Sequence, residues 1–271
     1  MGILNVTPDS FSDGGKLFGT HAGRAAVSVT QSIEMAAGMV ADGARLLDVG
    51  GESTRPGAAV VSVQEELDRV LPVVEALATR FDAIVSVDTS TPAVIEGAAR
   101  LGAGMVNDIR ALTRPGALDA AVASDMAVCL MHMQGDPQTM QAEPHYQDVV
   151  GDVFDYLQLR LSACLQAGIA AERLTVDPGF GFGKTVMHNY QLLQALARFA
   201  QLEVPLLVGM SRKSMIGKVV DRPVGQRVAG SVAAAVLAVE RGADIIRVHD
   251  VRETMDALKV VAAMKAVEVR D

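Results

Sequence analysis

Short apolar runs recur along the chain, and polar residues close most of them. Asp48, Asp88, Asn107, Asp177 and Arg247 each follow directly on such a run. Continuous apolar stretches of this length are typical of parallel strands that are buried on both faces. Because the carboxyl ends of parallel strands meet at one edge, we expect these polar side chains to lie together on a single rim.

Eight apolar runs qualify as strands, and each is followed by a helical pattern or a helix-bearing segment. They cover residues 2–6, 45–49, 84–88, 104–107, 127–132, 173–177, 206–210 and 244–248. This alternation predicts an α/β fold, a (β/α)8 TIM barrel, with residues 1–271 in a single domain.

The junctions between these elements carry their own signals. Gly43, Gly102 and Gly242 each precede a strand, where a left-handed glycine ends a helix and lets the chain turn. Residues 62–65 fit a helix capping box, and residues 91–92 pair an N-cap threonine with a proline at the first helical position.

Three long polar connections follow predicted strands. Residues 7–20 and 49–61 are rich in Gly, Pro, Ser and Asp, which predicts mobile loops at the rim. Residues 133–150 form a polar, proline-bearing excursion before the next helix.

Composition narrows the class of protein. The 271 residues carry a formal charge of -8, and no block of Lys or Arg stands out, which argues against a nucleic-acid binder. No run approaches 18 apolar residues and no signal peptide is visible, so we expect a cytoplasmic protein without membrane contact. Cys129 and Cys164 lie in apolar surroundings without metal-binding spacing and are predicted to be reduced core thiols.

Three strand ends suggest recognition of a flat heterocycle. Asp88, Asn107 and Asp177 supply acceptors and an amide for a ring with amino and N–H donors. Asp177 leads into the glycine-rich stretch 178–184, where the backbone can approach a ligand and two phenylalanines, Phe180 and Phe182, can form a stacking wall. Taken singly, strand-end aspartates can be helix caps, and the glycines can simply build a tight turn.

Cationic groups are expected on the same rim: Arg55, Arg212, Lys213, Arg247 and His249. Together they suggest a phosphate or pyrophosphate site. The alternatives are salt bridges from the arginines to the same aspartates, and a structural histidine at position 249. The other histidines lack ligand spacing, so none is assigned to a metal.

Seven stretches of the chain, in order, resemble the dihydropteroate synthase family, whose members are pterin-binding barrels. They span residues 2–15, 48–57, 86–90, 107–109, 177–184, 209–214 and 246–250. This resemblance implies the condensation of 6-hydroxymethyl-7,8-dihydropterin pyrophosphate with p-aminobenzoate to give 7,8-dihydropteroate and pyrophosphate. It also implies a Mg²⁺ cofactor, a homodimer and inhibition by sulfonamides.

The resemblance assigns roles by position. The pterin would contact Asp88, Asn107, Met131, Asp177, Phe182, Gly209 and Lys213. The p-aminobenzoate would contact Phe11, Ser53, Thr54, Pro56 and Ser214. Pyrophosphate would be bound by Asn5, Arg55, Arg247 and His249, with Asn5 also holding the metal, and the catalytic residues would be Asp13, Arg55 and Lys213.

Two other functions remain open on this fold. A corrinoid-linked methyltetrahydrofolate methyltransferase would share the pterin site but would not need to bind pyrophosphate. The presence of residues 53–57 and 211–214 argues against this function. A non-catalytic pterin-binding protein would retain the pocket without turnover. The presence of four residues argues against this function: Asn5, Asp13, Arg55 and His249.

Overall fold

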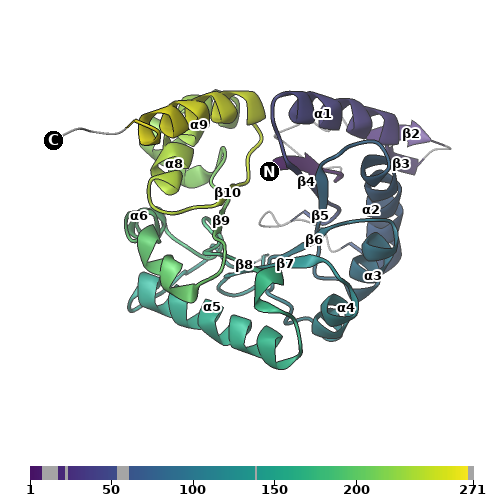
Figure 1. Cartoon of the computed structure of the whole chain (residues 1–271), viewed down its shortest axis with the longest axis horizontal. Coiled ribbons are helices and arrows are strands. Elements are labelled where there is room, and N and C mark those ends of the chain that lie inside the picture. The colour runs from purple at the N-terminus through teal and green to yellow at the C-terminus, as the bar shows by residue number, and fades with distance from the viewer. Residues whose placement is uncertain (8–17, 22–23, 54–60, 138, 268–271) are drawn as a thin grey trace.

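A computed structural model describes residues 1–7, 18–21, 24–53, 61–137 and 139–267. Eight parallel strands form a ring at its centre (Figure 1). In order they are β1 (Gly2–Asn5), β4 (Leu46–Gly50), β5 (Ile84–Asp88), β6 (Met105–Asp108), β7 (Ala127–Met131), β8 (Leu174–Asp177), β9 (Leu207–Val208) and β10 (Ile245–Ile246). These strands lie where the sequence pattern predicts them.

The ring closes through main-chain contacts at two seams. β1 and the five strands β4 to β8 form one six-stranded sheet, and β9 pairs with β10. Val176 bridges to Leu206 at one seam, and Gly2 bridges to Val248 at the other. At the second seam the Ile3 N–H donates to the Val248 carbonyl over 3.1 Å. The predicted eight-stranded barrel is therefore confirmed.

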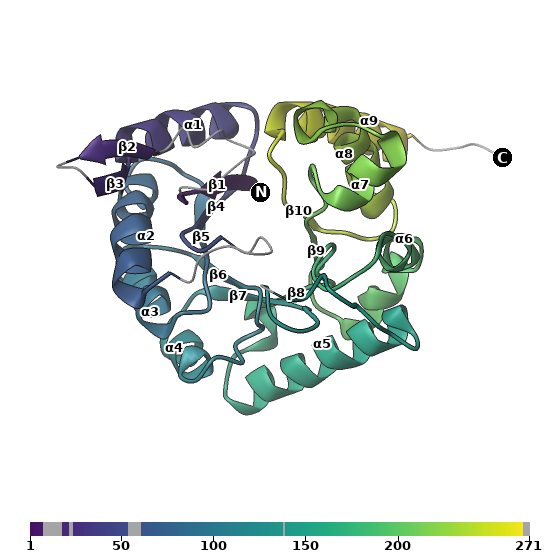
Figure 2. The ribbon, with the colours of Figure 1, turned by 180° about the vertical axis from the view of Figure 1, so that it is seen from behind.

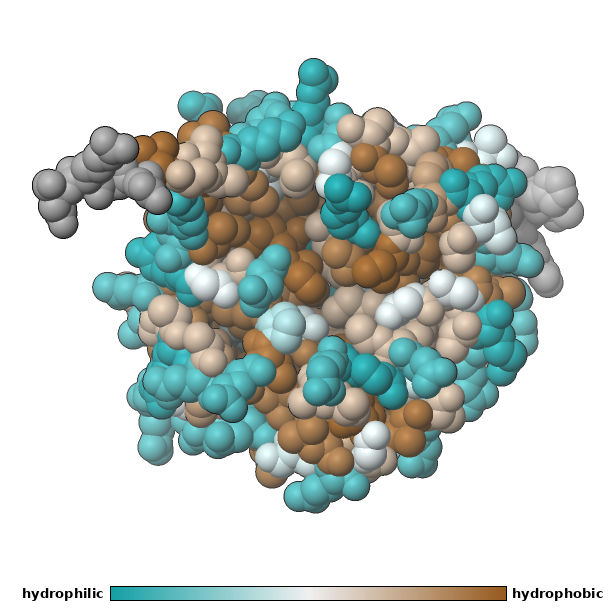
Figure 3. Space-filling model, viewed as in Figure 1, coloured by the Kyte–Doolittle hydropathy of each residue, from teal (hydrophilic) through white to brown (hydrophobic). Residues whose placement is uncertain are grey.

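Helices surround the strands in both views of the ribbon (Figures 1 and 2). They are α1 (Val29–Ala41), α2 (Val63–Ala78), α3 (Pro92–Arg100), α4 (Ala117–Ala123), α5 (Val149–Gln166), α6 (Val186–Gln194), α7 (Ser214–Val220), α8 (Val228–Val239) and α9 (Val251–Lys265). None of the helices in the described ranges is both long and apolar enough to cross a membrane. On the face drawn in Figure 3, hydrophilic side chains dominate the periphery of the molecule.

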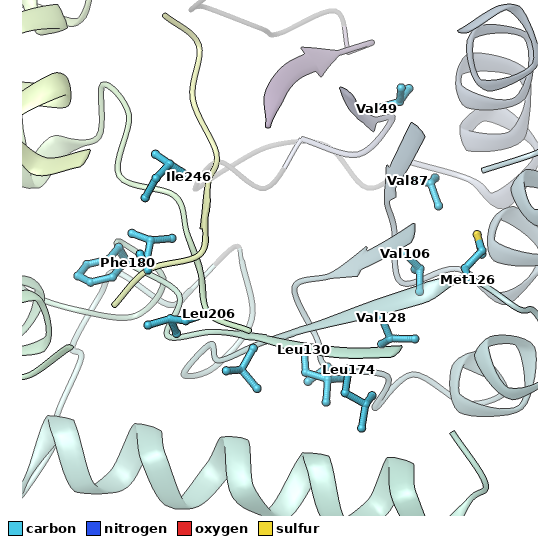
Figure 4. Packing of buried hydrophobic residues seen from close by; sticks show 14 of the residues in the cluster. Val49, Val87, Val106, Met126, Val128, Leu130, Leu174, Phe180, Leu206 and Ile246 are labelled. Atoms are coloured by element: carbon cyan, nitrogen blue, oxygen red, sulfur yellow. The ribbon is translucent and has the colours of Figure 1, made fainter. Parts of the chain in front are cut away.

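Strand alternation divides the core into two layers. Val49, Val87, Val106 and Leu174 point from their strands toward the surrounding helices (Figure 4), where they join a large buried cluster. The residues between them face the barrel axis because successive side chains of a strand point to opposite faces. A small inner cluster, centred on Met105, Cys129 and Leu207, fills part of that interior.

The inner face changes from apolar to polar toward the carboxyl ends of the strands. Two residues beyond Leu46, Met105 and Ile245, on the same face, stand Asp48, Asn107 and Arg247. The same period of two that packs the barrel therefore delivers polar groups to its carboxyl-terminal mouth.

The turn signals are largely confirmed. Gly43, Gly102 and Gly242 have φ values of 103°, 91° and 95°. Ser62 caps α2 by accepting from the Glu65 N–H over 3.3 Å. The Glu65 carboxylate pairs with Arg69 instead of returning to the cap, so the predicted capping box is only half formed.

The expected loop 7–20 needs a correction. It runs into an antiparallel hairpin of β2 (Phe18–His21) and β3 (Arg24–Val27) that precedes α1. Strands of four residues give too short an alternation to stand out in a sequence rich in Gly and Thr. Residues 8–17 and 54–60 of the two expected rim loops lie outside the described residues.

Cys129 and Cys164 are buried and free, as predicted. Burial raises the pKa of both thiols, since the thiolate is disfavoured in an apolar environment.

Candidate functional site

A buried carboxylate organises the polar mouth of the barrel. Asp48 on β4 is fully buried and accepts three side-chain hydrogen bonds. They come from Ser86 Oγ at 2.6 Å, Asn107 Nδ2 at 3.1 Å and Arg247 Nε at 2.6 Å. Residues of β5 and β6 and the residue after β10 are thus tied to one carboxylate, whose two oxygens can accept several hydrogen bonds.

Arg247 joins this group to a second carboxylate. Its Nη2 atom donates to Asp88 Oδ2 over 2.9 Å, so the guanidinium lies between Asp48 and Asp88. Burial alone lowers the pKa of Arg247, but the two carboxylates outweigh burial and raise that pKa above its ordinary value. The salt-bridge alternative for this arginine is therefore realised in the structure.

Asp88 titrates unusually. Burial raises the pKa of Asp88 to about 7, against the guanidinium of Arg247, which lowers it. The charges of Asp48, Asp108 and Glu52 add to the increase. Carboxylates with strongly shifted pKa values cluster at functional sites, so Asp88 is a candidate functional residue.

The Asn107 amide has a fixed orientation. A carboxylate only accepts, so the Nδ2 group of Asn107 must face Asp48. Its Oδ1 atom is then buried, and no donor among the described residues reaches it. Buried acceptors are nearly always paired in proteins, so this atom is suited to an N–H group of a ligand.

Asp177 lies at the end of β8 and is 5% exposed. Its Oδ1 atom accepts from the Gly179 N–H over 2.7 Å, which leaves the second oxygen able to accept from elsewhere. Burial raises the pKa of Asp177, while the nearby charge of Lys213 lowers it. Lys213 and Asp177 are therefore coupled across the mouth.

The glycine-rich stretch after β8 is both a tight turn and a wall. A Cβ atom on Gly179 would lie 1.9 Å from the His132 carbonyl oxygen, so no other residue fits there. Lys213 Nζ lies 4.7 Å from the centroid of the Phe182 ring and donates to the Phe180 carbonyl over 2.5 Å. Burial lowers the pKa of Lys213 to about 8.

Asn5 lies beside these groups. A Cβ atom on Gly50 would lie 3.6 Å from Asp88 Oδ2 and 3.7 Å from Asn5 Oδ1, so both side chains flank that glycine. A Cβ atom placed on Gly209 would lie 3.7 Å from Arg247 Cβ, so Gly209 adjoins Arg247. The acceptors expected for the ring and the groups expected for pyrophosphate thus share one mouth.

Two further basic residues of the described ranges, His249 and Arg212, are already engaged. His249 Nδ1 lies 3.0 Å from Ser211 Oγ, and burial lowers the pKa of His249 to about 3, so the ring is neutral near pH 7. Arg212 donates to both carboxylate oxygens of Asp250. The salt-bridge alternative expected from the sequence is therefore realised for Arg212 as well.

Other predicted site residues are placed as follows. Met131 ends β7 and is 4% exposed, Ser53 lies partly buried beyond β4, and Ser214 is the exposed first residue of α7. Several predicted residues lie outside the described ranges: Phe11, Asp13, Thr54, Arg55 and Pro56.

Asp48 was noted as a strand end but was not predicted to belong to the site. The signal was present, because Asp48 closes its apolar run just as Asp88 closes the next. Sequence patterns give its location, whereas its three partners depend on strand register, which pairs Asp48 with Ser86 and Asp88 with Asn107.

Comparison with known proteins gives one consistent family. A family model described as "Pterin binding enzyme" matches residues 1–249. The dihydropteroate synthase of Escherichia coli strain K12 is 57% identical over 263 residues, which cover 97% of this chain and 90% of that protein. The likeness in sequence therefore extends over nearly the whole chain.

Solved structures agree. The Yersinia pestis dihydropteroate synthase in complex with a sulfonamide drug is 55% identical with a TM-score of 0.93, covering 98% of this chain and 94% of that one. The Xanthomonas albilineans dihydropteroate synthase with 4-aminobenzoic acid is 50% identical with a TM-score of 0.90, and the match covers 99% of this chain and 93% of that one.

Proposed function

The chain belongs to the dihydropteroate synthase family of pterin-binding enzymes, and from this premise we propose how the mouth of its barrel performs the reaction. The protein is a transferase of folate biosynthesis. It condenses 6-hydroxymethyl-7,8-dihydropterin pyrophosphate with p-aminobenzoate to give 7,8-dihydropteroate and pyrophosphate. One C–O bond breaks at the exocyclic methylene and one C–N bond forms there.

The observation that carries the proposed site is the unused oxygen of Asn107. With Asp48 fixing the amide, Oδ1 accepts a pterin N–H while Asp177 accepts from the amino and ring N–H groups. Asp88 completes the set of acceptors. Lys213 contacts the ring, and Met131, Phe182 and Gly209 form the surrounding walls.

Pyrophosphate departure needs positive charge at the mouth. Arg247 lies between Asp48 and Asp88, and a bound diphosphate competes with these carboxylates for its guanidinium N–H groups. His249 offers a ring N–H as a neutral donor, since its pKa is lowered by burial. Neutralising the leaving group stabilises the charge that develops when the C–O bond breaks.

The donor chemistry of the mouth fits Mg²⁺. Mg²⁺ prefers oxygen ligands and usually shares substrate phosphates with one or two protein oxygens. Asn5 Oδ1 and a carboxylate oxygen of Asp88 flank Gly50, and such oxygens suit the ion. We assign Asn5 as the protein ligand; the ion would supply charge neutralisation to the pyrophosphate oxygens.

The arylamine pocket is proposed from Phe11, Ser53, Thr54, Pro56 and Ser214, with Asp13, Arg55 and Lys213 acting at the reacting centre. Ser214 donates to the p-aminobenzoate carboxylate. Sulfonamides, which mimic p-aminobenzoate, are expected to compete for the same pocket, in keeping with the drug complex of the Yersinia pestis protein.

A two-product assay tests the function. The purified protein receives the pterin pyrophosphate, p-aminobenzoate and Mg²⁺, and both pyrophosphate release and dihydropteroate formation are followed. Equal amounts of the two products are expected. Pterin binding without either product would instead indicate a non-catalytic pterin-binding protein.

The pH dependence follows from two groups of the pocket. Protonation of Asp88 below about pH 7 removes an acceptor, and deprotonation of Lys213 above about pH 8 removes a cation. We expect kcat/KM for the pterin substrate to give a narrow bell with its maximum between these values. Asp88→Asn should remove the acid limb; an acid limb unchanged in that variant would assign it to the substrate.

Arg55→Ala is expected to lower kcat about a hundredfold while changing pterin affinity little, because Arg55 is proposed to act on the departing pyrophosphate. Equilibrium binding of the pterin and single-turnover rates separate the two effects. A loss of pterin affinity at unchanged turnover would contradict the role.

We also propose a cytoplasmic homodimer. Apolar side chains are exposed along α8 and α9, with Leu237 44%, Val260 70% and Met264 57% exposed. Exposed apolar groups on neighbouring helices favour burial against a second copy. Sedimentation at several concentrations tests this assembly.

A further inference from the structure

A buried lysine that the reaction does not use is the last residue of the glycine-rich stretch 178–184. Lys184 is 3% exposed. Its Nζ atom lies 2.9 Å from His132 Nδ1, 2.9 Å from the Gly179 carbonyl oxygen and 3.0 Å from the Phe182 carbonyl oxygen. These three contacts offset the cost of burying the amino group, and a fully hydrogen-bonded buried group fixes its partners relative to one another.

The stretch depends on side chains for its shape. Each of the five consecutive carbonyls from Gly179 to Gly183 accepts a hydrogen bond from a side chain. The donors are Lys184 to Gly179 and Phe182, Lys213 to Phe180, Gln141 to Gly181 and Tyr146 to Gly183. Gly179, Gly181 and Gly183 have left-handed φ angles of 69°, 84° and 62°, so the backbone alone has little preference for this course.

Lys184 connects the two ends of this stretch that touch the proposed pterin pocket. The Gly179 N–H donates to Asp177 Oδ1, and Phe182 lies under Lys213. Lys184 Nζ binds the carbonyls of both Gly179 and Phe182.

The third partner of Lys184 reaches the neighbouring strand. His132 follows β7 directly, is 5% exposed, and donates its backbone N–H to the Asp177 carbonyl over 2.9 Å. Burial, reinforced by the charge of Lys184, lowers the pKa of His132 to about 2, so the imidazole stays neutral. As an ammonium, Lys184 donates three bonds; as an amine, it donates two and accepts one from the imidazole N–H, so both charge states preserve the contacts.

We propose that Lys184 is a positioning residue for pterin binding: it ties the Gly179 and Phe182 carbonyls to His132 and so fixes Phe182 relative to Asp177. The inference rests on the proposed pterin pocket. Lys184 does not touch the pterin; it acts through the backbone that carries the wall and the hydrogen-bonding partner of Asp177.

The test is Lys184→Met, which keeps an unbranched chain of similar length and removes the amino group. Calorimetric binding of 6-hydroxymethylpterin is expected to weaken at least tenfold, and KM for p-aminobenzoate to stay within threefold of the wild-type value. Hydrogen–deuterium exchange of residues 178–185 should quicken. Tyr146→Phe, which removes a hydrogen bond from the same stretch beyond Phe182, should weaken pterin binding less than threefold.

If Lys184→Met does not fold, a pair of variants at His132 provides the test. His132→Asn retains an acceptor near the position of Nδ1, whereas His132→Leu removes it, so His132→Leu should weaken pterin binding several-fold more than His132→Asn. Equal pterin affinity in wild type and a folded Lys184→Met, or in both His132 variants, would overturn the inference. A wild-type protein that does not bind 6-hydroxymethylpterin would instead overturn the proposed pocket.

Discussion

Replacing Arg247 with methionine is expected to destabilise the protein by about 3–5 kcal/mol, because it leaves the fully buried Asp48 without its cation. For a protein of this size, that corresponds to a decrease in Tm of roughly 6–20 °C. The same variant should lose nearly all turnover, since the guanidinium is proposed to receive the pyrophosphate. Thermal unfolding followed by circular dichroism measures the first effect, and pyrophosphate release measures the second.

Two comparisons make the Arg247 experiment specific. Lys259→Met breaks an ion pair with Asp256 whose side chains are 70% and 66% exposed, and should leave Tm unchanged within about 2 °C. Adding Asp48→Asn to Arg247→Met removes the uncompensated charge and should recover part of the lost stability. A double variant less stable than Arg247→Met would show that the buried charge is not the cause.

Asp177→Asn is expected to weaken pterin binding by about 30- to 100-fold, the equivalent of roughly 2–3 kcal/mol for a charged hydrogen-bonding partner. One oxygen can still accept from the Gly179 N–H, but the other becomes an NH₂ group that faces the donors of the ring. Calorimetry with 6-hydroxymethylpterin gives the affinity directly.

The matched control for that variant is Asp148→Asn. Asp148 caps α5 by accepting from the Val150 N–H over 3.1 Å, and asparagine caps a helix equally well. It should leave pterin affinity unchanged. If Asp177→Asn also retained full affinity, Asp177 would have to be removed from the pocket.

The sequence predicts the barrel well because an apolar run marks each of its eight strands. At three of them, β4, β6 and β10, a second signal agrees, since Gly43, Gly102 and Gly242 mark the turns that precede these strands. It predicts less where elements are short. The sequence does not predict the hairpin of β2 and β3, since strands of four residues give too little alternation.

The sequence also predicts which polar residues reach the mouth, but not which partners they choose. Arg247 was expected to face phosphate, and its pairing with Asp48 and Asp88 depends on the curvature that brings the last strand round to the second. Lys184 lies in the glycine-rich stretch 178–184, but the sequence does not predict its partners, which are mainly backbone carbonyls whose directions are set by three left-handed glycines.

The contact between Arg247 and Asp48 spans 199 positions of the chain. It connects the end of the last barrel strand, β10, to the second barrel strand, β4. Contacts between such distant segments carry a large loop-closure entropy that must be overcome before they stabilise the fold. A nascent chain that lacks Arg247 has no guanidinium to pair with Asp48. We therefore expect activity to appear only after the last strand has been synthesised, because Arg247 is proposed to bind the pyrophosphate.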